Sequence, residues 1–595
     1  MVTKTNLKAT FRLFKKHIVR FITILAIVVV SIGFMSGIGE IEGKIKTAVY
    51  GYYTTQNISD LHLKSTSPTG FSEEELMWIS DKFSTQNTET FFAMEEKVGD
   101  KISRIYTFDF DNQNINKIQL LEGMMPASEN EVLVERSTNF LEEHSLGDKV
   151  VVNGVEYTVC GIVLNPMLIN RIEEYSWQYQ AEGGYLTNVF YHDSSDFLVV
   201  TDVYVTLENR KLFSECFSEK YKTEIASLRA EVMQGIGFDK VAVLSLSENI
   251  GIFSLCEYGR KVGIISVVFV VFFLLVTLLV VYSTMQRLLT EERSQIACMK
   301  TLGFSNASIL IKYAVFVFAS ALVGGVIAFP VGYGLSYLIY EAFNLYYAMP
   351  DFPQTLKFFY YLMSLVIILV TTTALTYLTG LKTTKEKPAN LLMPKAPKSG
   401  KKVFLEHIPF VWSRLSFKYK STIRNVLLFK SRLFMTVLSI MGATVLVFSG
   451  LGLMDCSKSI PGGESLSTIS AVLIVFSAML CALVIYNLTN INISERHREV
   501  ATLMVLGYHN KEVTGYIFRE IYIMSFVAAL LGLPVGVGFI EFAFSLIDFG
   551  SVSQIKWTTW VFTPILTMAF SFLSTLLLYK KITKIDMNAS LKTVE

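Results

Sequence analysis

Residues 262–282 read VGIISVVFVVFFLLVTLLVVY, a stretch without a charged side chain. An apolar stretch of about 20 residues spans the hydrocarbon core of a bilayer as a helix, because a helix satisfies its own backbone N–H and C=O groups. Seven other stretches share this character: Phe21 to Ile38, Tyr313 to Ile339, Phe358 to Leu378, Leu433 to Leu453, Ile469 to Leu488, Ile521 to Ile540 and Trp557 to Tyr579. Together they predict an α-helical polytopic membrane protein with eight spans; burial in a large soluble core is the alternative.

The charges are segregated, although the chain carries 53 Lys and Arg residues against 51 Asp and Glu residues. In residues 47–258, acidic residues outnumber basic residues by about two to one. Basic residues gather between residues 382 and 432 and before the first span, at Lys8, Arg12, Lys15, Lys16 and Arg20. Because Lys and Arg beside spans stay on the cytoplasmic side, we expect both termini in the cytoplasm and residues 47–258 outside it.

A basic region before an apolar stretch also describes a cleaved signal peptide. The first stretch is longer than a usual signal core and no convincing small-x-small site follows it, so we interpret it as an uncleaved anchor. Four cysteines then face outward, where one disulfide is the alternative to free thiols: Cys160, Cys216, Cys256 and Cys456. The seven histidines show no ligand-like spacing, so we expect no metal site.

The spans repeat at a constant offset of 204 residues. The matching pairs are Tyr282 and Tyr486, Glu291 and Glu495, Ala297 and Ala501, Leu302-Gly303 and Leu506-Gly507, and Pro330, Gly332 and Gly334 with Pro534, Gly536 and Gly538. Each half therefore holds four spans in the same orientation, which is a parallel repeat about an axis along the membrane normal.

Only the first half carries a large segment between its first and second spans. In that segment, residues 131–134, 149–152 and 155–163 read as strands, and Asn153-Gly154 is a tight hairpin turn. The charged stretch from Phe213 to Met233 suits an amphipathic helix. We expect a mixed α/β domain whose acidic surface is a solvated face rather than a cation site.

These observations divide the chain into six parts: a cytoplasmic helix and first span (1–46), an outer α/β domain (47–258), the next three spans (259–380), a basic cytoplasmic linker (381–432), the four spans of the second repeat (433–580) and a cytoplasmic tail (581–595).

Two matching segments follow the second and sixth spans. Residues 290–305 read TEERSQIACMKTLGFS, and residues 494–508 read SERHREVATLMVLGY. Each begins charged, becomes amphipathic and stops at a glycine, which readily takes the left-handed conformation that ends a helix. We expect a short helix at the cytoplasmic face in each, docking a soluble partner and receiving force from it; an ordinary loop is the alternative.

This pattern resembles the FtsX/MacB/LolC-like permeases of ABC transporters. Leu121-Glu-Gly123 with Pro126, residues 131–134, Leu146-Gly-Asp148 and residues 159–163 resemble the MacB-like core of that family's outer domain. The linker, with residues 395–402, Leu405-Glu406, residues 412–417, Lys420 and Arg424-Asn425, resembles the duplicated, type VII-like permeases common in Gram-positive bacteria.

The resemblance implies that two copies of a cytoplasmic ABC ATPase bind the paired helices, close on ATP and transmit the motion to the outer domain of a protein in the bacterial cell membrane. The residues implied in coupling are Glu291, Glu292, Arg293, Leu302, Gly303, Glu495, Arg496, Glu499, Leu506 and Gly507. The chain departs from the family pattern at Gln295, which stands where Glu499 keeps the usual acid, and in having no large second outer domain.

The chain has no phosphate-binding loop of its own. Its nearest run, Ser399-Gly-Lys-Lys402, lacks the first glycine and the hydroxyl that such a loop needs. We therefore expect ATP and Mg²⁺ on the partner ATPase, and no catalytic, cofactor or metal residue and no nucleic-acid partner for this chain. Pro330 with Gly332 and Pro534 with Gly536 are flexing points or static packing kinks.

Three functions remain open at this stage. The first is export or extraction of a peptide, lipid or amphiphile, for which an apolar groove in the outer domain is expected. The second is regulation of an extracytoplasmic cell-wall hydrolase or sensor, for which a protein-sized contact patch is expected. The third is a scaffold that works without an ATPase. Because charges deep in the spans are scarce, an ion relay has little support.

Overall fold

The computed structural model describes residues 4–136, 144–169, 176–178, 184–195, 199–208, 218–349, 352–353, 358–392, 406, 409–414, 416–428, 430–459 and 464–583. The chain divides into two compact units. The helical unit comprises Met1–Glu40, Val262–Ile339 and Leu356–Glu595, and the sheet unit comprises Ile41–Lys261 and Tyr340–Thr355.

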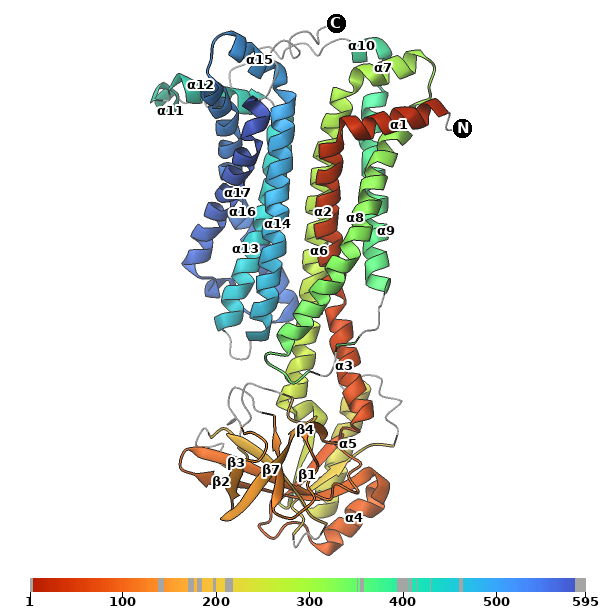
Figure 1. Ribbon diagram of the computed structural model, residues 1–595, viewed down its shortest axis with the longest axis vertical. Helices are drawn as coiled ribbons and strands as arrows, with labels where there is room; N and C mark the ends of the chain where they lie inside the picture. Colours follow the sequence, from red (N-terminus) through yellow and green to blue (C-terminus); the bar gives the residue numbers. More distant parts are fainter. Residues whose placement is uncertain are drawn as a thin grey trace. The chain divides into compact units, whose positions relative to one another are not determined.

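Eight helices in the described residues are long and apolar enough to cross a membrane. They are α2 (Ile18–Gly39), α6 (Ile250–Glu291), α8 (Asn306–Phe343), α9 (Phe358–Thr384), α13 (Lys430–Ser459), α14 (Glu464–Glu495), α16 (Asn510–Ile547) and α17 (Trp557–Thr583), shown in Figure 1. Each contains one of the eight apolar stretches, so the predicted polytopic fold is confirmed.

Shorter helices flank these spans: α1 (Lys4–Lys16), α3 (Ile41–Thr55), α7 (Arg293–Thr301), α10 (Pro388–Leu392), α11 (Pro409–Arg414), α12 (Phe417–Leu428) and α15 (His497–Val505). The bounds of α7 and α8 recur in α15 and α16 at the offset of 204 residues. The duplication read from the sequence is therefore a duplication of structure.

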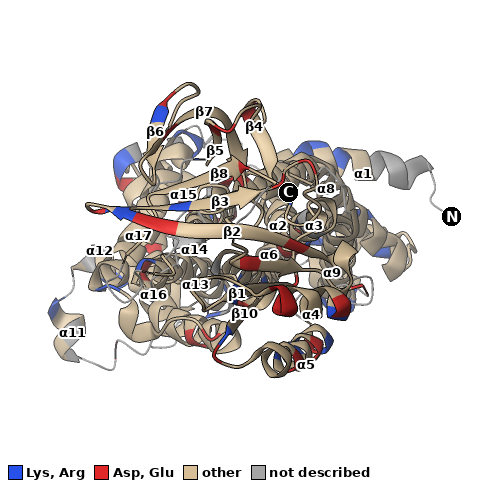
Figure 2. Ribbon diagram, turned by 90° about the horizontal axis from the view of Figure 1, so that it is seen from below, with Lys and Arg blue, Asp and Glu red and all other residues tan. Residues whose placement is uncertain are grey.

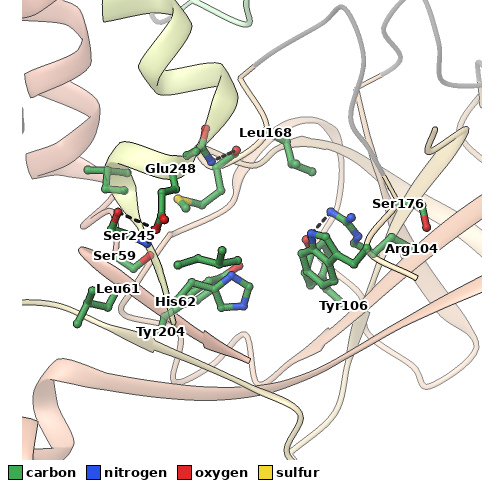
Figure 3. Close-up of a pocket in the computed structure, with 15 residues that line it drawn as sticks. Ser59, Leu61, His62, Arg104, Tyr106, Leu168, Ser176, Tyr204, Ser245 and Glu248 are labelled. Carbon is green, nitrogen blue, oxygen red and sulfur yellow. Dashed lines mark hydrogen bonds between the residues drawn. The ribbon is translucent and has the colours of Figure 1, made fainter. Parts of the chain in front are cut away.

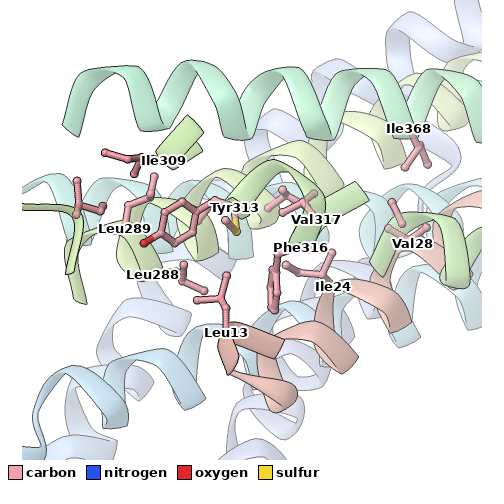
Figure 4. Packing of buried hydrophobic residues seen from close by; sticks show 14 of the residues in the cluster. Leu13, Ile24, Val28, Leu288, Leu289, Ile309, Tyr313, Phe316, Val317 and Ile368 are labelled. Carbon is pink, nitrogen blue, oxygen red and sulfur yellow. The ribbon is translucent and has the colours of Figure 1, made fainter. Parts of the chain in front are cut away.

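The apolar core of the first repeat joins α1, α2, α6, α8 and α9, as Figure 4 shows. Leu13 of α1 is buried in it beside Leu288 and Tyr313. The Phe14 and Phe316 rings lie 5.1 Å apart in a tilted arrangement, and Phe21 lies 5.7 Å from the Phe316 ring. Helix α1 is therefore packed onto the spans by its apolar side chains.

The two repeats meet inside the helical unit. Phe34 of α2 stacks on Phe273 of α6 with ring centroids 4.2 Å apart, and lies 5.7 Å from Phe476 of α14. Near the ends of α6 and α14, the Asn487 side-chain amide donates to the Thr284 hydroxyl at 2.8 Å. A hydrogen bond between two buried polar groups holds α6 and α14 in one register.

The predicted flexing points lie where helices cross closely. A Cβ added at Gly37 of α2 would lie 2.8 Å from the carbonyl oxygen of Gly332, and one added at Gly536 would lie 2.7 Å from the Phe448 ring. Helices α8 and α16 continue through Pro330 and Pro534. Small residues at a crossing let two backbones approach, so these glycines serve packing; flexing remains a prediction.

The sheet unit is a ten-stranded mixed sheet with the order β10-β1-β9-β2-β3-β8-β5-β7-β4, and β6 pairs with β7. The strands are β1 (Leu61–Ser65), β2 (Thr88–Val98), β3 (Lys101–Phe108), β4 (Gln119–Gly123), β5 (Glu131–Glu135), β6 (Lys149–Val152), β7 (Val155–Leu164), β8 (Asn188–Asp193), β9 (Asp202–Val205) and β10 (Val241–Ser245). The pairs β3–β8 and β5–β7 are parallel.

The three predicted strands are confirmed as β5, β6 and β7. Val152 pairs with Val155 across the turn, whose residues Asn153 and Gly154 have φ angles of 51° and 76°. Positive φ at both central residues gives the turn the twist that a two-residue hairpin needs. Gly123 has a φ of 86°, and a Cβ there would lie 2.2 Å from the Cys160 carbonyl oxygen, which explains the glycine in the Leu-Glu-Gly motif.

Two helices belong to the sheet unit, α4 (Glu73–Phe83) and α5 (Glu219–Ile236). The amphipathic helix predicted from Phe213 begins instead at Glu219 in the described residues, because the Ser218 side chain accepts from the Tyr221 N–H and caps it; residues 213–217 lie outside the described residues. Acidic residues of α4 and α5 are red in Figure 2. The cysteines within the described residues are unbridged thiols, and Cys216 lies outside them.

Changing Gly37 to Ala should lower the stability of the helical unit by about 1–3 kcal/mol, because the new methyl group overpacks the crossing of α2 and α8. The measurement is the thermal unfolding midpoint of the full chain in lipid nanodiscs. Gly334→Ala is the matched control: nothing lies within 4 Å of a Cβ there, and the helix should gain a few tenths of a kcal/mol or more. Equal midpoints for the two variants would show that the crossing is loose.

Glu135 should make the sheet unit less stable as the pH rises. Burial raises the pKa of Glu135 from 4.5 to about 8, although the Tyr191 hydroxyl and the Asn165 N–H donate to it. The folded form holds its proton more tightly than the unfolded form, so the stability that protonation confers is complete below about pH 4.5 and lost as the pH rises through about 8. Amide-exchange protection factors of β5 and β8 should fall across this window. Glu135→Gln should flatten the dependence; an unchanged slope in that variant would contradict the assignment.

Candidate functional site

The short helices α7 and α15 follow the two long helices α6 and α14 at a sharp change of direction. The residues at the break are Glu292, with φ −87° and ψ 10°, and Arg496, with φ −106° and ψ 16°. Helix α7 buries Ile296 and Ala297, and α15 buries Val500 and Ala501 at the matching positions. Figure 1 shows α7 and α15 at the same end of the helical unit. Each is therefore a surface helix held by one apolar face.

Both short helices stop at the predicted glycine. Gly303 has a φ of 85° and Gly507 a φ of 89°, and nothing lies within 4 Å of a Cβ at either. The left-handed backbone, not a lack of space, therefore requires glycine here. Leu302 and Leu506 directly precede the glycines and are 75 % and 69 % exposed. Each repeat thus presents a leucine at an equivalent, solvent-facing turn.

In the first repeat, the break is fixed by a buried carboxylate. Glu292 is 1 % exposed; its Oε1 accepts from Lys16 Nζ at 2.7 Å and lies 3.1 Å from His17 Nε2. Burial alone would raise the pKa of Glu292, but the hydrogen bonds from His17 and Lys16 and the charges of Lys16 and Lys312 outweigh it and hold that pKa at about 2. The ionised carboxylate therefore ties the break to the junction of α1 and α2.

In the second repeat, the equivalent residue carries the opposite charge. Arg496 is 2 % exposed and forms an ion pair with Glu520 of α16 at 2.7 Å. Glu520 also pairs with Arg432 of α13. A buried charge left without a partner costs several kcal/mol, so each break needs its own counter-charge. In the first repeat, cations pair with the buried acid at the break. In the second repeat, an acid pairs with the buried cation at the break.

The last residues of α6 and α14 join these ion pairs. Glu291 accepts from Arg20 at 2.5 Å. Glu495 lies 3.7 Å from Arg432 of its own repeat and 3.4 Å from Arg287 of the other. Glu495 thus receives arginines from both repeats, and the Arg287–Glu495 contact connects them at the level of the short helices.

Helix α7 is also fastened to the end of α9 and to α10. Arg293 donates to Glu386 at 2.7 Å, and Lys300 Nζ donates to the carbonyl oxygens of Thr384 and Glu386 at 2.5 and 2.7 Å. Basic side chains thereby bind carbonyl groups that the end of a helix leaves unsatisfied.

The structure divides the charged residues that open the two segments between the preceding helices and the breaks. Glu291 and Glu495 end the preceding helices, and Glu292 and Arg496 are buried at the breaks, because each binds a counter-charge within the chain. Exposed residues of the two segments include Gln295, Leu302, Glu499, Leu506 and, after α15, Tyr508.

Sequence reasoning missed several members of the ion-pair network, among them Arg287, Arg432 and Glu520. Each lies at or near an end of an apolar stretch, where a charge has to find a partner or reach the interface. That position was the available signal. The sequence did not reveal which residues pair with one another, because the partners lie far apart along the chain.

The comparisons with known proteins bear on these same helices. A family model described as FtsX-like permease C-terminal matches residues 267–388 and again residues 471–587. No curated protein matches the chain. The two matches begin 204 residues apart, and each includes three long helices and one short helix of a repeat. The chain thus carries the FtsX-like permease domain twice, as a duplicated permease of the FtsX type, a family of multi-pass membrane subunits of ABC transporters.

Proposed function

We propose that this chain converts the closure of two ABC ATPase subunits on ATP into movement of its sheet unit outside the cell, for export or extraction of a peptide, lipid or amphiphile. The observation that carries the proposal is the pair of equivalent short helices, α7 and α15, at one end of the helical unit. FtsX-like permeases generally partner with ABC ATPases. Two equivalent helices suit two copies of one ATPase.

The exposed residues at the two turns are suited to bind a soluble protein. Leu302 in the first repeat, and Val505, Leu506 and Tyr508 in the second, are exposed apolar residues beside polar ones. Apolar anchors within a polar rim are the usual energetic centre of a protein interface. Each ATPase subunit would cover one turn.

The ion pairs supply a path for force behind each turn. A push on α7 reaches α1 and α2 through Glu292 with Lys16 and His17, and a push on α15 reaches α16 through Arg496 and Glu520. Buried pairs resist separation because separating them leaves an uncompensated charge. Glu495 and Arg287 then couple the two repeats.

The two docking sites are unequal in this proposal. Gln295 is exposed on α7 where α15 exposes Glu499, so at this position the second site alone has a carboxylate, which lies 3.3 Å from Arg496. An acidic group steers a basic partner and raises the association rate. The ATPase should therefore bind α15 faster than α7.

The orientation follows from the charge distribution. Basic residues before α2 and between α9 and α13 favour the cytoplasmic side for both termini and both short helices, in a bacterial cell membrane. The acidic sheet unit then lies outside the cell. ATP and Mg²⁺ belong to the ATPase subunits in this arrangement.

Replacing both exposed leucines should abolish ATPase binding. Leu302→Asp and Leu506→Asp should each weaken copurification of the cognate ATPase about tenfold, and the double variant should retain none, because a charge in the centre of an interface is costly. Met77→Asp, at an exposed apolar residue of α4, is the control and should copurify normally. Full binding by the double variant would exclude these turns as the docking sites.

Arg287→Gln should separate ATPase binding from coupling between the repeats. The variant should copurify the ATPase normally, since the exposed turns are unchanged, while ATP hydrolysis in nanodiscs falls severalfold because Glu495 loses its contact with the first repeat. Arg260→Gln is the control in the same helix, because Arg260 is exposed and forms an ion pair with Glu257, three residues away in that helix. Hydrolysis that is equal in both variants would contradict the coupling role.

A further inference from the structure

Helix α1 carries an apolar stripe that the protein covers only at one end. Helical spacing places Phe11 and Phe14 on one face of α1. The Phe14 ring lies 5.3 Å from the Phe21 ring and 5.1 Å from the Phe316 ring, measured between centroids. Phe11 is 78 % exposed. The spans therefore cover the part of the stripe that holds Phe14 and leave Phe11 outside.

Basic side chains lie beside this stripe. Helix α1 has 13 residues, of which five are Lys or Arg and none is Asp or Glu. Arg12 and Lys15 are exposed, share a face at a spacing of three, and form no ion pair or side-chain hydrogen bond among the described residues. Lys16 differs, because its Nζ binds Glu292. The helix thus presents two exposed cations next to an exposed phenylalanine.

The cations around a cavity in the sheet unit differ from these two in having partners. The cavity has a volume of about 250 Å³, and Figure 3 shows Arg104 and His62 among the residues that line it. Arg104 lies 2.8 Å from Glu95, a carboxylate of the same domain. His62 and Lys64 lie 2.7 and 3.6 Å from Asp202. Carboxylates within the chain therefore bind these cations, whereas the two exposed cations of α1 remain available to a partner outside the chain.

The place of α1 follows from the span that comes directly after it. Helix α2 begins at Ile18, and Ile18, Val19 and Ile22 are exposed apolar residues of this span. Exposed apolar side chains on a membrane span contact acyl chains. The chain turns at His17, whose φ is −117° and ψ is 32°, and Figure 1 shows α1 lying crosswise to α2. Helix α1 therefore lies along the membrane surface, where hydrocarbon meets headgroups.

This set of side chains fits an anionic lipid surface. On a helix at the interface, an exposed phenylalanine enters the acyl region, and basic residues beside it reach the headgroup phosphates. A zwitterionic headgroup has no net charge to attract Arg12 and Lys15, whereas an anionic headgroup does. The bilayer that covers Ile18 and Val19 also extends to Phe11, since α1 and α2 are separated only by His17. A soluble protein would cover the cations but would have to displace lipid from this edge.

We propose that α1 binds anionic phospholipids, with Phe11 among the acyl chains and with Arg12 and Lys15 paired with negatively charged headgroups. The lipid then holds α1 from outside, while Leu13 and Phe14 hold it against the spans. Lys16, at the end of α1, binds Glu292 at the break before α7, so the lipid also steadies the support of that break. Lipid binding by α1 requires neither an ATPase nor a particular orientation of the chain, and is independent of the proposed function.

The test measures which lipid surrounds position 11 of the full chain in nanodiscs, without an ATPase. Phe11→Trp introduces a fluorescent reporter, and the emission of the unchanged chain, which has five tryptophans, is subtracted. All discs contain the same mixture of phosphatidylglycerol, which is anionic, and phosphatidylcholine, which is zwitterionic. In one set the phosphatidylglycerol carries bromine on its acyl chains, and in the other set an equal amount of the phosphatidylcholine does. Bromine quenches tryptophan on contact, so the two sets differ only in which lipid reports.

Brominated phosphatidylglycerol should quench the introduced tryptophan severalfold more strongly than brominated phosphatidylcholine, because each cation near an anionic surface contributes about a fivefold preference. Arg12→Gln combined with Lys15→Gln should make quenching equal in the two sets. Lys385→Gln combined with Lys387→Gln is the matched control, because it removes the same charge from exposed lysines after α9, and the preference should remain.

Equal quenching by both lipids in the Phe11→Trp chain would overturn the proposal, because it would show contact with the bilayer without a preference for charge. Absence of quenching by either lipid would also overturn it and would assign this face of α1 to a protein partner. Salt gives a second measurement on a chain that keeps Arg12 and Lys15. A high concentration of NaCl screens exposed charges and should abolish the preference reversibly, even if the double Gln variant failed to fold. A preference that persists at high salt would contradict the role of the two cations.

Discussion

A charge buried at the end of a transmembrane helix has to be paired, and this constraint determines how the short helices α7 and α15 are held. Glu292 and Arg496 stand at the two breaks, where the chain turns from a long helix into a short one. Each is buried because a counter-charge from another element reaches it. Helix α1 is bound to the first repeat through this requirement as well as through Leu13 and Phe14.

The duplication preserves the pairing and inverts its sign. The acid at the break of the first repeat forms ion pairs with Lys16 and His17, whereas the arginine at the break of the second forms an ion pair with Glu520. If only the residue at the break changed the sign of its charge, it would lie against a like charge. The break residue and its partner therefore have to change together. The partners come from different elements, the α1–α2 junction and α16, so the two repeats support equivalent helices from different sides.

Sequence reasoning located the features that depend on short stretches of chain. A bilayer constrains about 20 consecutive residues at once, so all eight spans were visible, and Asn153-Gly154 determined the β6–β7 hairpin locally. The ion pairs depend on residues far apart, such as Lys16 and Glu292, which are 276 positions apart in the chain. The sheet register likewise aligns Leu244, His62 and Tyr204, which lie far apart along the chain.

The contact between Arg287 and Glu495 bears on why one outer domain can suffice. Glu495 ends α14, whereas Arg287 lies in α6, whose residues extend from the helical unit into the sheet unit. In the proposed function, a push received at α15 therefore has a route to α6 that requires no outer domain in the second repeat. Force from both ATPase subunits then reaches α6, the helix that continues into the sheet unit. A second outer domain would receive this force but would not generate it, so one outer domain can suffice.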